Sequence, residues 1–314
     1  MKRTALNNRI ELLLVQFLFG VANLLPRGVA LALGRWAGWF MFHVLRIRRN
    51  VVLANLRYAF GDSKTPAELQ QIAAGAYENV GMTAMEFARF PRITRRHIAE
   101  NFRYEDHPGW VSIRERVAAR QGAVLVAAHF SSWETGAVVL QAAGLPVLCL
   151  AADLHNPLVN RFIRRMRLAA GVPTISVRDS LKPVFRALDE GMIVVFVADQ
   201  DARAEGITVR FFGRPTQAHR GPAVMALKRR CPIYPAFNIR ERFGVHRLSV
   251  HGPLWGHDTG NFEEDVRDLT QRYFDAYEEM IRHRPDLWFW LHRRWKDAPV
   301  REAAAVSSVA GGVE

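Results

Sequence analysis

The sequence predicts an α/β protein in which helices cover a mostly parallel central sheet, with membrane-associated helices at the N-terminus. Short apolar runs alternate with helical patterns through most of the chain, as in a sheet that is covered on both faces. Two longer apolar stretches precede these runs. The chain has 314 residues, which is enough for a substantial buried core.

Five short apolar runs are suited to buried strands, and a sixth run alternates more strongly. They are residues 123–128, 146–152, 173–177, 192–198 and 232–237, with the alternating run at 247–251. Helical patterns lie between them at 134–143, 157–170, 181–190 and 221–230, and a long helix is expected at 262–283. Upstream, Thr65-Pro66-Ala67-Glu68 is a capping box that opens a helix to about residue 90. A charged helix past Trp110 leads to Gly122.

The N-terminal apolar stretches occupy residues 10–25 and 29–45. Each is near or below the roughly 20 residues that span a bilayer. The first run lacks a small-residue cleavage site, which argues against a cleaved signal peptide. We expect a membrane-embedded or interfacial helix and then an amphipathic one, with basic flanks on the cytoplasmic side. Two buried helices of a soluble core are the alternative. The expected division is anchoring helices at 1–49, an α/β domain at 50–298 and a disordered tail at 299–314.

The net charge is +13, and only five of the 43 basic residues are lysines. Arginine forms bidentate contacts with phosphates and carboxylates, so anionic lipids, phosphorylated sugars, nucleic acid or an acidic carrier protein are candidate partners. The chain contains no P-loop, GxGxxG, GxSxG or HExxH pattern, which weakens nucleotide-binding, serine-hydrolase and zinc-protease interpretations. Cys149 and Cys231 stand apart in apolar runs, so we expect core thiols and neither a zinc site nor a disulfide framework.

The candidate catalytic motif is His129-Phe-Ser-Ser-Trp-Glu134. Its spacing alone is weak, because His292 and Asp297 match it too. His129, however, directly follows a predicted strand and precedes a predicted helix, at the sheet edge where α/β proteins bind ligands. Glu134 would hold one ring nitrogen, so that the other can take a proton from an alcohol. A histidine merely satisfied by a nearby acid is an equal alternative.

Other candidate site residues lie at similar positions. Arg167 is at the edge of the apolar arc of its helix and is expected to point toward the site, although it could simply lie over apolar surface. Asp199 and Asp201 follow the strand at 192–198, and one of them is expected to pair with Arg167 unless both are turn residues. His292, Arg293 and Arg294 lie among tryptophans, which suits a lipid–water interface but also single-stranded nucleic acid.

Several ordered blocks resemble the bacterial late acyltransferases of lipid A biosynthesis, the lauroyl/myristoyl acyltransferase family. The segment around His129 resembles the HX4(D/E) motif of that family. Further similar blocks are residues 50–60, Asn156-Pro157 with Arg167, residues 198–201 and 211–213, Gly221-Pro222, and residues 290–296. The resemblance covers residues 10–298.

The resemblance implies a glycerol-phosphate-acyltransferase-like fold and an O-acyltransferase with no cofactor and no metal. His129 would be the general base and Glu134 its orienting partner, with Ser131 and Ser132 as less favoured nucleophiles. Arg167 would bind a phosphate or polarise the acyl carbonyl. The remaining expected substrate-binding residues are Asp199, Asp201, His292, Arg293 and Arg294.

The resemblance also implies the partners and the location. The donor would be acyl carrier protein, with coenzyme A as an open alternative, and the acceptor would be a hydroxyl of a lipid A precursor or related glycolipid. The enzyme would lie at the bacterial inner membrane with its catalytic domain on the cytoplasmic side, and it would bind no nucleic acid. Other acceptors stay open: a phosphatidylinositol mannoside, an ornithine lipid or a polyene lipid. A non-catalytic, basic membrane-surface or nucleic-acid-binding protein is the alternative from another class.

Overall fold

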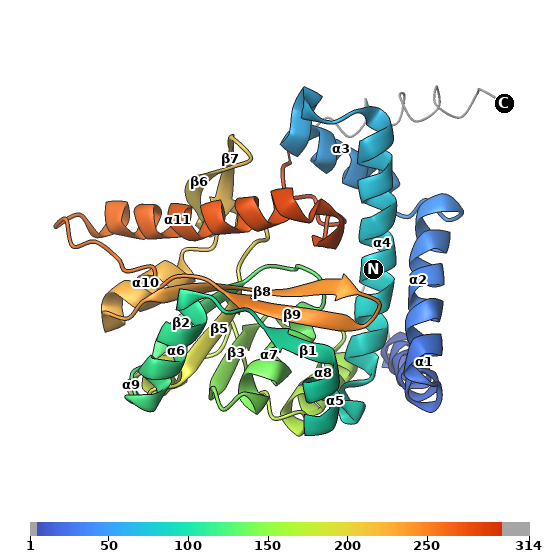
Figure 1. The fold of residues 1–314 in the computed structure, drawn as a ribbon, viewed down its shortest axis with the longest axis horizontal. Helices are drawn as coiled ribbons and strands as arrows, with labels where there is room; N and C mark the ends of the chain where they lie inside the picture. The colour runs from blue at the N-terminus through green and yellow to red at the C-terminus, as the bar shows by residue number, and fades with distance from the viewer. Residues whose placement is uncertain (1–4, 297–314) are drawn as a thin grey trace.

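The computed structural model describes residues 5–296 and is built on a seven-stranded sheet (Figure 1). The strand order is β1-β9-β8-β2-β5-β3-β4, and every neighbouring pair is parallel except β8 with β9. The strands are β1 Phe102–Tyr104, β2 Ala123–Ala127, β3 Val147–Ala151, β4 Thr174–Ser176, β5 Ile193–Val197, β8 Ile233–Arg242 and β9 Val245–Val250. The predicted mostly parallel sheet is confirmed.

Helices cover both faces of this sheet. On one face lie α9 (Lys182–Asp189), α10 (Gly221–Arg229) and α11 (Phe262–His283), and on the other α5 (Arg95–Asn101), α6 (Pro108–Ala118) and α7 (Trp133–Ala142). Both faces of the sheet need cover because alternate side chains of a strand point to opposite faces. In β2, Val124 and Val126 pack in the core with α9, α10 and α11, whereas Ala123 and Leu125 pack in the core with α5, α6 and α7. Figure 1 shows α11 and α7 on opposite sides of the sheet, and α8 (Pro157–Ala169) contacts the outer strand β4.

A second, two-stranded sheet was not predicted. Strands β6 (Ile207–Phe211) and β7 (Arg214–Ala218) form an antiparallel hairpin that packs against α11. Only alternate residues of β6 are buried, and β7 contains Pro215 and exposed polar residues. Because neither strand is a continuous apolar run, the pattern used to find the other strands did not find this hairpin.

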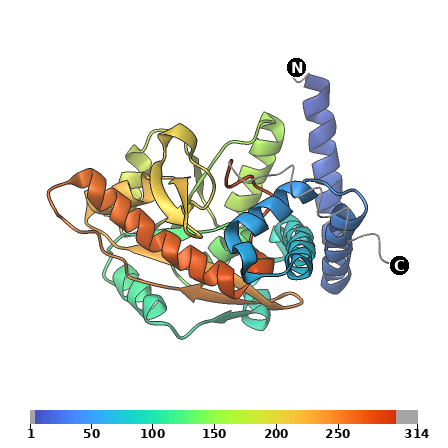
Figure 2. The same cartoon turned by 90° about the horizontal axis from the view of Figure 1, so that it is seen from above.

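The first four helices are α1 (Ala5–Leu24), α2 (Arg27–His43), α3 (Arg49–Phe60) and α4 (Pro66–Ala88). Helix α1 is long and apolar enough to cross a membrane, and Ala22 is its one buried residue. It projects from the body of the protein, with the N-terminus at its far end (Figure 2). Its exposed apolar side chains are Leu6, Ile10, Leu13, Leu14, Phe17, Leu18 and Leu24. Such exposure excludes the alternative in which both N-terminal helices are buried in a soluble core.

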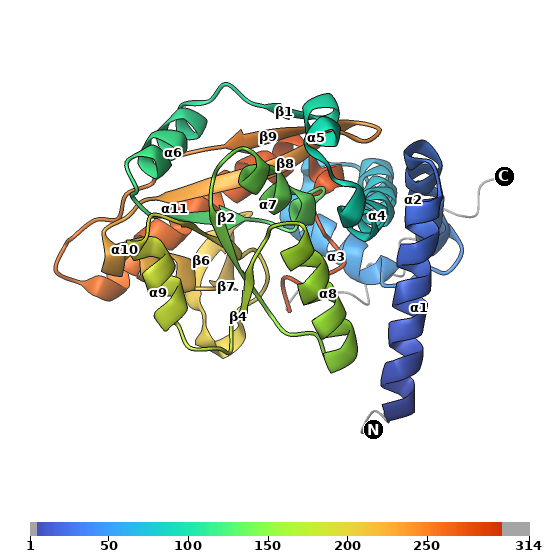
Figure 3. The ribbon, with the colours of Figure 1, turned by 90° about the horizontal axis from the view of Figure 1, so that it is seen from below.

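Helix α2 is held against α4 by close contact between their main chains. A methyl group at Gly38 would collide with the carbonyl of Tyr77, and one at Gly34 would collide with Gly81. The outer face of α2 leaves Trp36 and Trp39 exposed. The helix expected at 29–45 is thus present as α2, with apolar residues on its exposed face as well, and Figure 3 shows it beside α1 and α4.

The Thr65 capping box also forms as predicted at the start of α4. The expected disordered tail at 299–314, and Asp297 of the second HX4(D/E) match, lie outside the described residues.

Candidate active site

The site begins with two residues that follow adjacent strands. Ala127 of β2 pairs with Val197 of β5 in the parallel register, and His129 and Asp199 each come two residues later. The carboxyl ends of neighbouring parallel strands meet at one sheet edge, so the two side chains are placed together. The Nδ1 atom of His129 lies 2.6 Å from Oδ1 of Asp199.

Two further hydrogen bonds hold Asp199 in place beside His129. The main-chain N–H of His129 donates to Asp199 Oδ2 at 3.0 Å, and the indole N–H of Trp288 donates to the same oxygen at 2.7 Å. A carboxylate that accepts from Nδ1–H leaves Nε2 of the neutral ring as a proton acceptor. The side chain of His129 is 21% exposed, whereas that of Asp199 is 2% exposed. His129 can therefore be reached from outside, while its partner cannot.

The buried Asp199 stays ionised because of these contacts. Burial raises the pKa of its carboxyl group, but the His129 ring and the hydrogen bonds from His129 and Trp288 outweigh burial and hold the pKa below its usual value. A charged carboxylate beside Nδ1 fixes the ring tautomer and stabilises the imidazolium that forms when Nε2 takes a proton. The pair thus has the geometry of a general base and its orienting acid.

The prediction that Glu134 hydrogen-bonds to His129 is wrong. Glu134 forms its hydrogen bonds with Arg167 instead. The guanidinium of Arg167 donates from Nε to Oε2 at 3.0 Å and from Nη2 to Oε1 at 2.5 Å. Glu134 lies in the first turn of α7, where the helix carries its side chain toward α8 and away from the ring. Neither Asp199 nor Asp201 pairs with Arg167, so the pairing expected for these aspartates is wrong.

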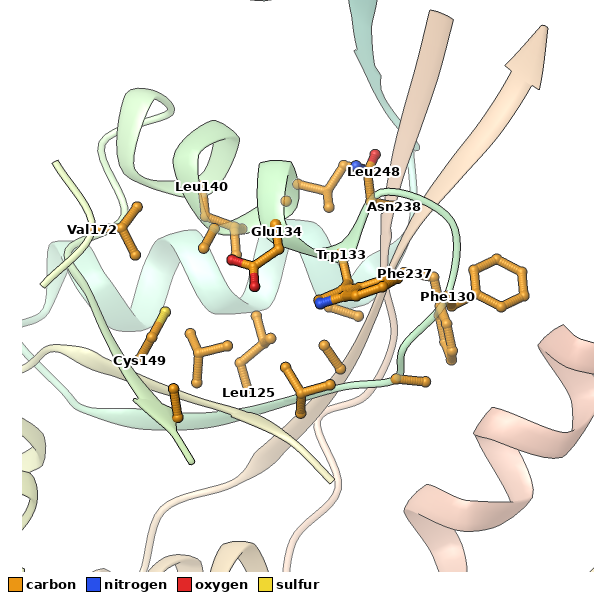
Figure 4. A pocket seen from close by; sticks show the side chains of 18 of the residues that line it. Leu125, Phe130, Trp133, Glu134, Leu140, Cys149, Val172, Phe237, Asn238 and Leu248 are labelled. Carbon is orange, nitrogen blue, oxygen red and sulfur yellow. The ribbon is translucent and has the colours of Figure 1, made fainter. Parts of the chain in front are cut away.

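An apolar cavity opens beside the Glu134–Arg167 pair. It lies between α7 and the sheet, and encloses about 740 Å³, including open solvent at its mouth. Figure 4 shows the Glu134 carboxylate among the apolar side chains that line it. Residues that line the cavity include Leu125, Trp133, Leu140, Cys149, Val172, Val195 and Phe237. An elongated hydrocarbon group matches such a lining in chemistry.

A buried polar network fixes the loop between His129 and α7. Ser131 has a positive φ of 49° and no exposure, and its carbonyl accepts from Thr83 at 3.0 Å. The Ser131 hydroxyl accepts from the main-chain N–H of Arg240 at 3.1 Å, while Asn238 donates to the Ser132 carbonyl at 2.7 Å. Ser131 therefore has a local hydrogen-bonding role, whereas Ser132 makes no side-chain capping bond to α7.

His292, Arg293, Arg294 and Lys296 lie near the end of the described chain, and Arg294 and Lys296 line one pocket with Pro215, Thr216 and Gln217 of β7. Lys296 Nζ is 3.0 Å from Asp201 Oδ2, and the main-chain N–H of Asp201 donates to His292 Nε2 at 3.4 Å. Burial raises the pKa of Asp201, but Lys296 and a main-chain N–H from Arg203 hold it below its usual value. Arg293 is exposed, whereas Arg294 is buried. The three residues predicted as one substrate-binding run thus occupy different surroundings.

Two contributors to the site were missed. The indole of Trp288 completes the hydrogen bonding of Asp199, although the sequence indicated only that aromatic residues gather there. The amide nitrogen of Gln200 lies 3.4 Å from Nε2 of His129, the ring nitrogen that does not face Asp199. Within residues 5–296, no group of three histidine, cysteine or carboxylate side chains is placed to hold a metal ion.

Comparisons with known proteins show the family of the chain. The family described as bacterial lipid A biosynthesis acyltransferase matches residues 2–297. A lipid A biosynthesis palmitoleoyltransferase of Escherichia coli is 24% identical over 285 residues, covering 89% of each chain. A lauroyltransferase of the same organism is 25% identical over 280 residues, covering 88% of each. A phosphatidylinositol mannoside acyltransferase of Mycobacterium tuberculosis is 26% identical over 235 residues, covering 71% of this chain and 70% of the relative. The chain is an acyltransferase and belongs to the bacterial lipid A biosynthesis acyltransferase family.

Proposed function

We propose that the enzyme transfers a fatty acyl chain from acyl carrier protein to a hydroxyl group of a lipid A precursor or a related glycolipid. The observation that carries the proposal is the His129–Asp199 pair at 2.6 Å beside an apolar cavity. A base next to a hydrocarbon site is what transfer of an acyl chain to an alcohol requires. The lipid A relatives match over 88–89% of this chain, which favours such an acceptor over a phosphatidylinositol mannoside, whose transferase matches over 71%.

The proposed reaction begins with proton transfer. Nε2 of His129 removes the proton from the acceptor hydroxyl, and Asp199 stabilises the imidazolium through Nδ1–H. The alkoxide attacks the thioester carbonyl, so that a carbon–oxygen bond forms. The carbon–sulfur bond then breaks, and the leaving thiolate takes the proton back from His129. No serine nucleophile is needed, and Ser131 and Ser132 are both buried.

Arg167 and Glu134 have the second role in this proposal. Arg167 lines the cavity, and its guanidinium would stabilise the negative oxygen of the tetrahedral intermediate. Glu134 holds two of its nitrogens and thereby fixes its position. We therefore propose that Glu134 orients Arg167. The role predicted for Glu134, which is to orient His129, is assigned to Asp199.

The proposed location is the bacterial inner membrane, with the catalytic domain on the cytoplasmic side. Support comes from the apolar exposed helix α1 and from the tryptophans of α2, which suit a lipid–water boundary. A hydroxyl on a membrane lipid would then be presented to His129 beside helix α1.

The test is acyl transfer by the purified full-length protein in detergent micelles. Acyl carrier protein charged with a fatty acid is mixed with a lipid A precursor or, separately, with a phosphatidylinositol mannoside, and products are read by mass spectrometry. We expect the lipid A precursor to gain the mass of one acyl chain, and His129→Ala to abolish the gain. A gain on the mannoside alone would refute the proposed acceptor, and full activity of His129→Ala would refute the proposed base.

A further inference from the structure

A second cavity, with a basic lining, shares helix α7 with the apolar cavity. Thr135 lines the second cavity, whereas its neighbours Glu134 and Gly136 line the apolar one. The second cavity encloses about 700 Å³, including open solvent at its mouth. We call it the arginine cavity, and its ionisable lining residues are Arg27, Glu86, Arg89, Arg92, His97 and His246. A group bound there would therefore lie beside the same turn of α7 as the Glu134–Arg167 pair.

The positive charge of the arginine cavity is not balanced by the protein. Among residues 5–296, Glu86 is the one carboxylate that lines it. Glu86 is already neutralised, because it accepts from Arg240 at 2.7 and 2.9 Å and from His246 at 2.8 Å. The three arginines of the lining form no ion pair with any carboxylate of the described chain. An anionic ligand would supply the missing negative charge.

The hydrogen bonds of these arginines go to neutral groups. Arg89 and Arg92 donate to main-chain carbonyls at the end of α1, including Leu25 at 2.7 Å and Asn23 at 2.9 Å. Arg27 donates to an amide oxygen and a main-chain carbonyl. These contacts hold the guanidinium groups in place, but within residues 5–296 they leave Nε of Arg89 and Nε of Arg92 without a partner. Burial lowers the pKa of Arg89, and the charge of Arg92 lowers it further, as expected of cations that face one another without an anion.

A buried polar atom in the same lining also lacks a partner. The side chain of His246 is 1% exposed, and its Nε2 is engaged by Glu86. Its Nδ1 has no hydrogen-bond partner within residues 5–296. Buried polar atoms without partners are rare in folded proteins, and Nδ1 of a protonated ring donates to an oxygen. This atom is a second, independent indication that a ligand with anionic oxygens belongs in the arginine cavity.

The position of the arginine cavity indicates which anion it takes. Helix α1 is long and apolar enough to cross a membrane, and Arg89 and Arg92 bind the carbonyls at its C-terminal end. The end of a spanning helix lies at the level of the lipid head groups. Arginine binds the oxygens of a phosphate group through two nitrogens at once. The arginine cavity is therefore placed for a phosphate group on a membrane lipid.

We propose that the arginine cavity binds a phosphate group on the head group of the acceptor, so that the enzyme selects a phosphorylated glycolipid. This inference rests on the proposed transfer of an acyl chain to a glycolipid. Arg27, Arg89 and Arg92 bind the phosphate in this assignment, while His129 and Asp199 remain responsible for the chemical step.

The first test measures kcat and KM for a phosphorylated glycolipid and for the same lipid after phosphatase treatment. In the unaltered protein we expect the KM of the phosphorylated lipid to be about tenfold lower. Arg92 is exposed and makes a single hydrogen bond, so Arg92→Met should fold normally. It should raise the KM of the phosphorylated lipid by about tenfold and leave kcat, the KM of the acyl donor and the KM of the dephosphorylated lipid unchanged.

Arg95→Met is the matched control, because it removes an exposed arginine of α5 that does not line the arginine cavity. It should change none of these constants. Equal KM values for the two lipids in the unaltered protein, or an equal effect of Arg92→Met on both lipids, would overturn the inference.

A binding measurement separates this inference from the proposed function. The full-length His129→Ala protein in detergent micelles is titrated with the phosphorylated glycolipid, with and without inorganic phosphate. We expect inorganic phosphate to displace the lipid, and added Arg92→Met to weaken lipid binding by about tenfold. Inorganic phosphate that binds without displacing the lipid would show a site for free phosphate and overturn the assignment to a head group.

The two claims then fail in different ways. Binding as expected, with no acyl transfer to either lipid by the unaltered protein, would refute the proposed function and retain the phosphate site. Acyl transfer to both lipids with equal KM would retain the proposed function and refute the phosphate site.

Discussion

Nδ1 of His129 lies 2.6 Å from Oδ1 of Asp199, although 70 residues separate the two in the chain. The contact exists because β2 and β5 are neighbours in a parallel register, which brings the residues after them to one edge. Because Asp199 contacts the ring, Glu134 is available to hold Arg167, which lines the apolar cavity. The two acids therefore act on different partners, and substitutions should separate their effects.

Removal of the Arg167 guanidinium should slow the chemical step. Arg167→Met should lower kcat by about 100-fold or more, because the oxyanion loses its charged donor. Arg167→Lys should recover part of the loss, and Glu134→Gln should cost less because the guanidinium remains. Steady-state kinetics with an acyl carrier protein donor measure this. Arg161→Met, which alters an exposed arginine of the same helix, is the control. Equal rates for Arg167→Met and Arg161→Met would exclude the role given to Arg167.

Most of the fold could be predicted because its strands are short, apolar and buried on both faces. The runs at 123–128, 146–152 and 192–198 correspond to β2, β3 and β5, and the helices between them begin and end within about two residues of the expected positions. The β6–β7 hairpin was missed because its strands are half exposed. A continuous apolar run therefore marks a strand that is buried on both faces, and it does not mark a half-exposed one.

The structure pairs the predicted site residues in another way than the sequence suggested. His129 and Asp199 follow neighbouring strands and Glu134 and Arg167 line the cavity, yet the expected Glu134–His129 bond is replaced by Asp199–His129 and Glu134–Arg167. Spacing along the chain shows which residues are close in sequence, but not which side chains meet in the fold. The order of strands, which decides that β5 rather than β3 lies next to β2, depends on the packing of the whole sheet.

Filling the cavity should shorten the acyl chain that the enzyme uses. Gly136 lies on α7 against the sheet, and a methyl group there would meet Asn238 at an ordinary 3.6 Å. Gly136→Leu would extend further into the cavity, so we expect transfer of the longest chains to fall by about tenfold relative to shorter ones.

Competition among donors of graded chain length measures this preference by mass spectrometry. Gly136→Ala, which adds one methyl group and favours the helix, is the control that should keep the original preference. If Gly136→Leu selects the same chain length as the unaltered enzyme, the acyl chain lies elsewhere.

Glu86 should stabilise the protein above mildly acidic pH. It is buried and accepts from Arg240 at 2.7 and 2.9 Å and from His246 at 2.8 Å. Burial raises the pKa of Glu86, but His246 and Arg240 outweigh it and hold the pKa well below the usual value. Removal of one partner from a buried ionic network costs about 3–5 kcal/mol, so Glu86→Gln should lower the free energy of unfolding by that amount at neutral pH.

The sign of the pH effect follows from the lowered pKa. The contribution is complete above the unfolded value of about 4.3 and is lost as the pH falls toward the folded value. The stability difference between the unaltered protein and Glu86→Gln should therefore be largest above about pH 5 and should shrink below it. Chemical denaturation at several pH values measures it. Glu100→Gln, at an exposed pair with Arg96, should show no measurable change. A stability difference between the two proteins that grows as the pH falls would contradict the prediction that ionised Glu86 stabilises the fold.

The most direct test of the account is the kcat of Asp199→Asn, measured beside Glu134→Gln in the same acyl-transfer assay. The asparagine keeps the size of the side chain but removes the charge that holds the ring tautomer and stabilises the imidazolium. We predict a fall in kcat of about 100-fold to 10,000-fold for Asp199→Asn, with little change in KM, and a smaller loss for Glu134→Gln. Asp199→Asn with the kcat of the unaltered enzyme, together with a collapse of activity in Glu134→Gln, would contradict the assignment of Asp199 as the partner of His129.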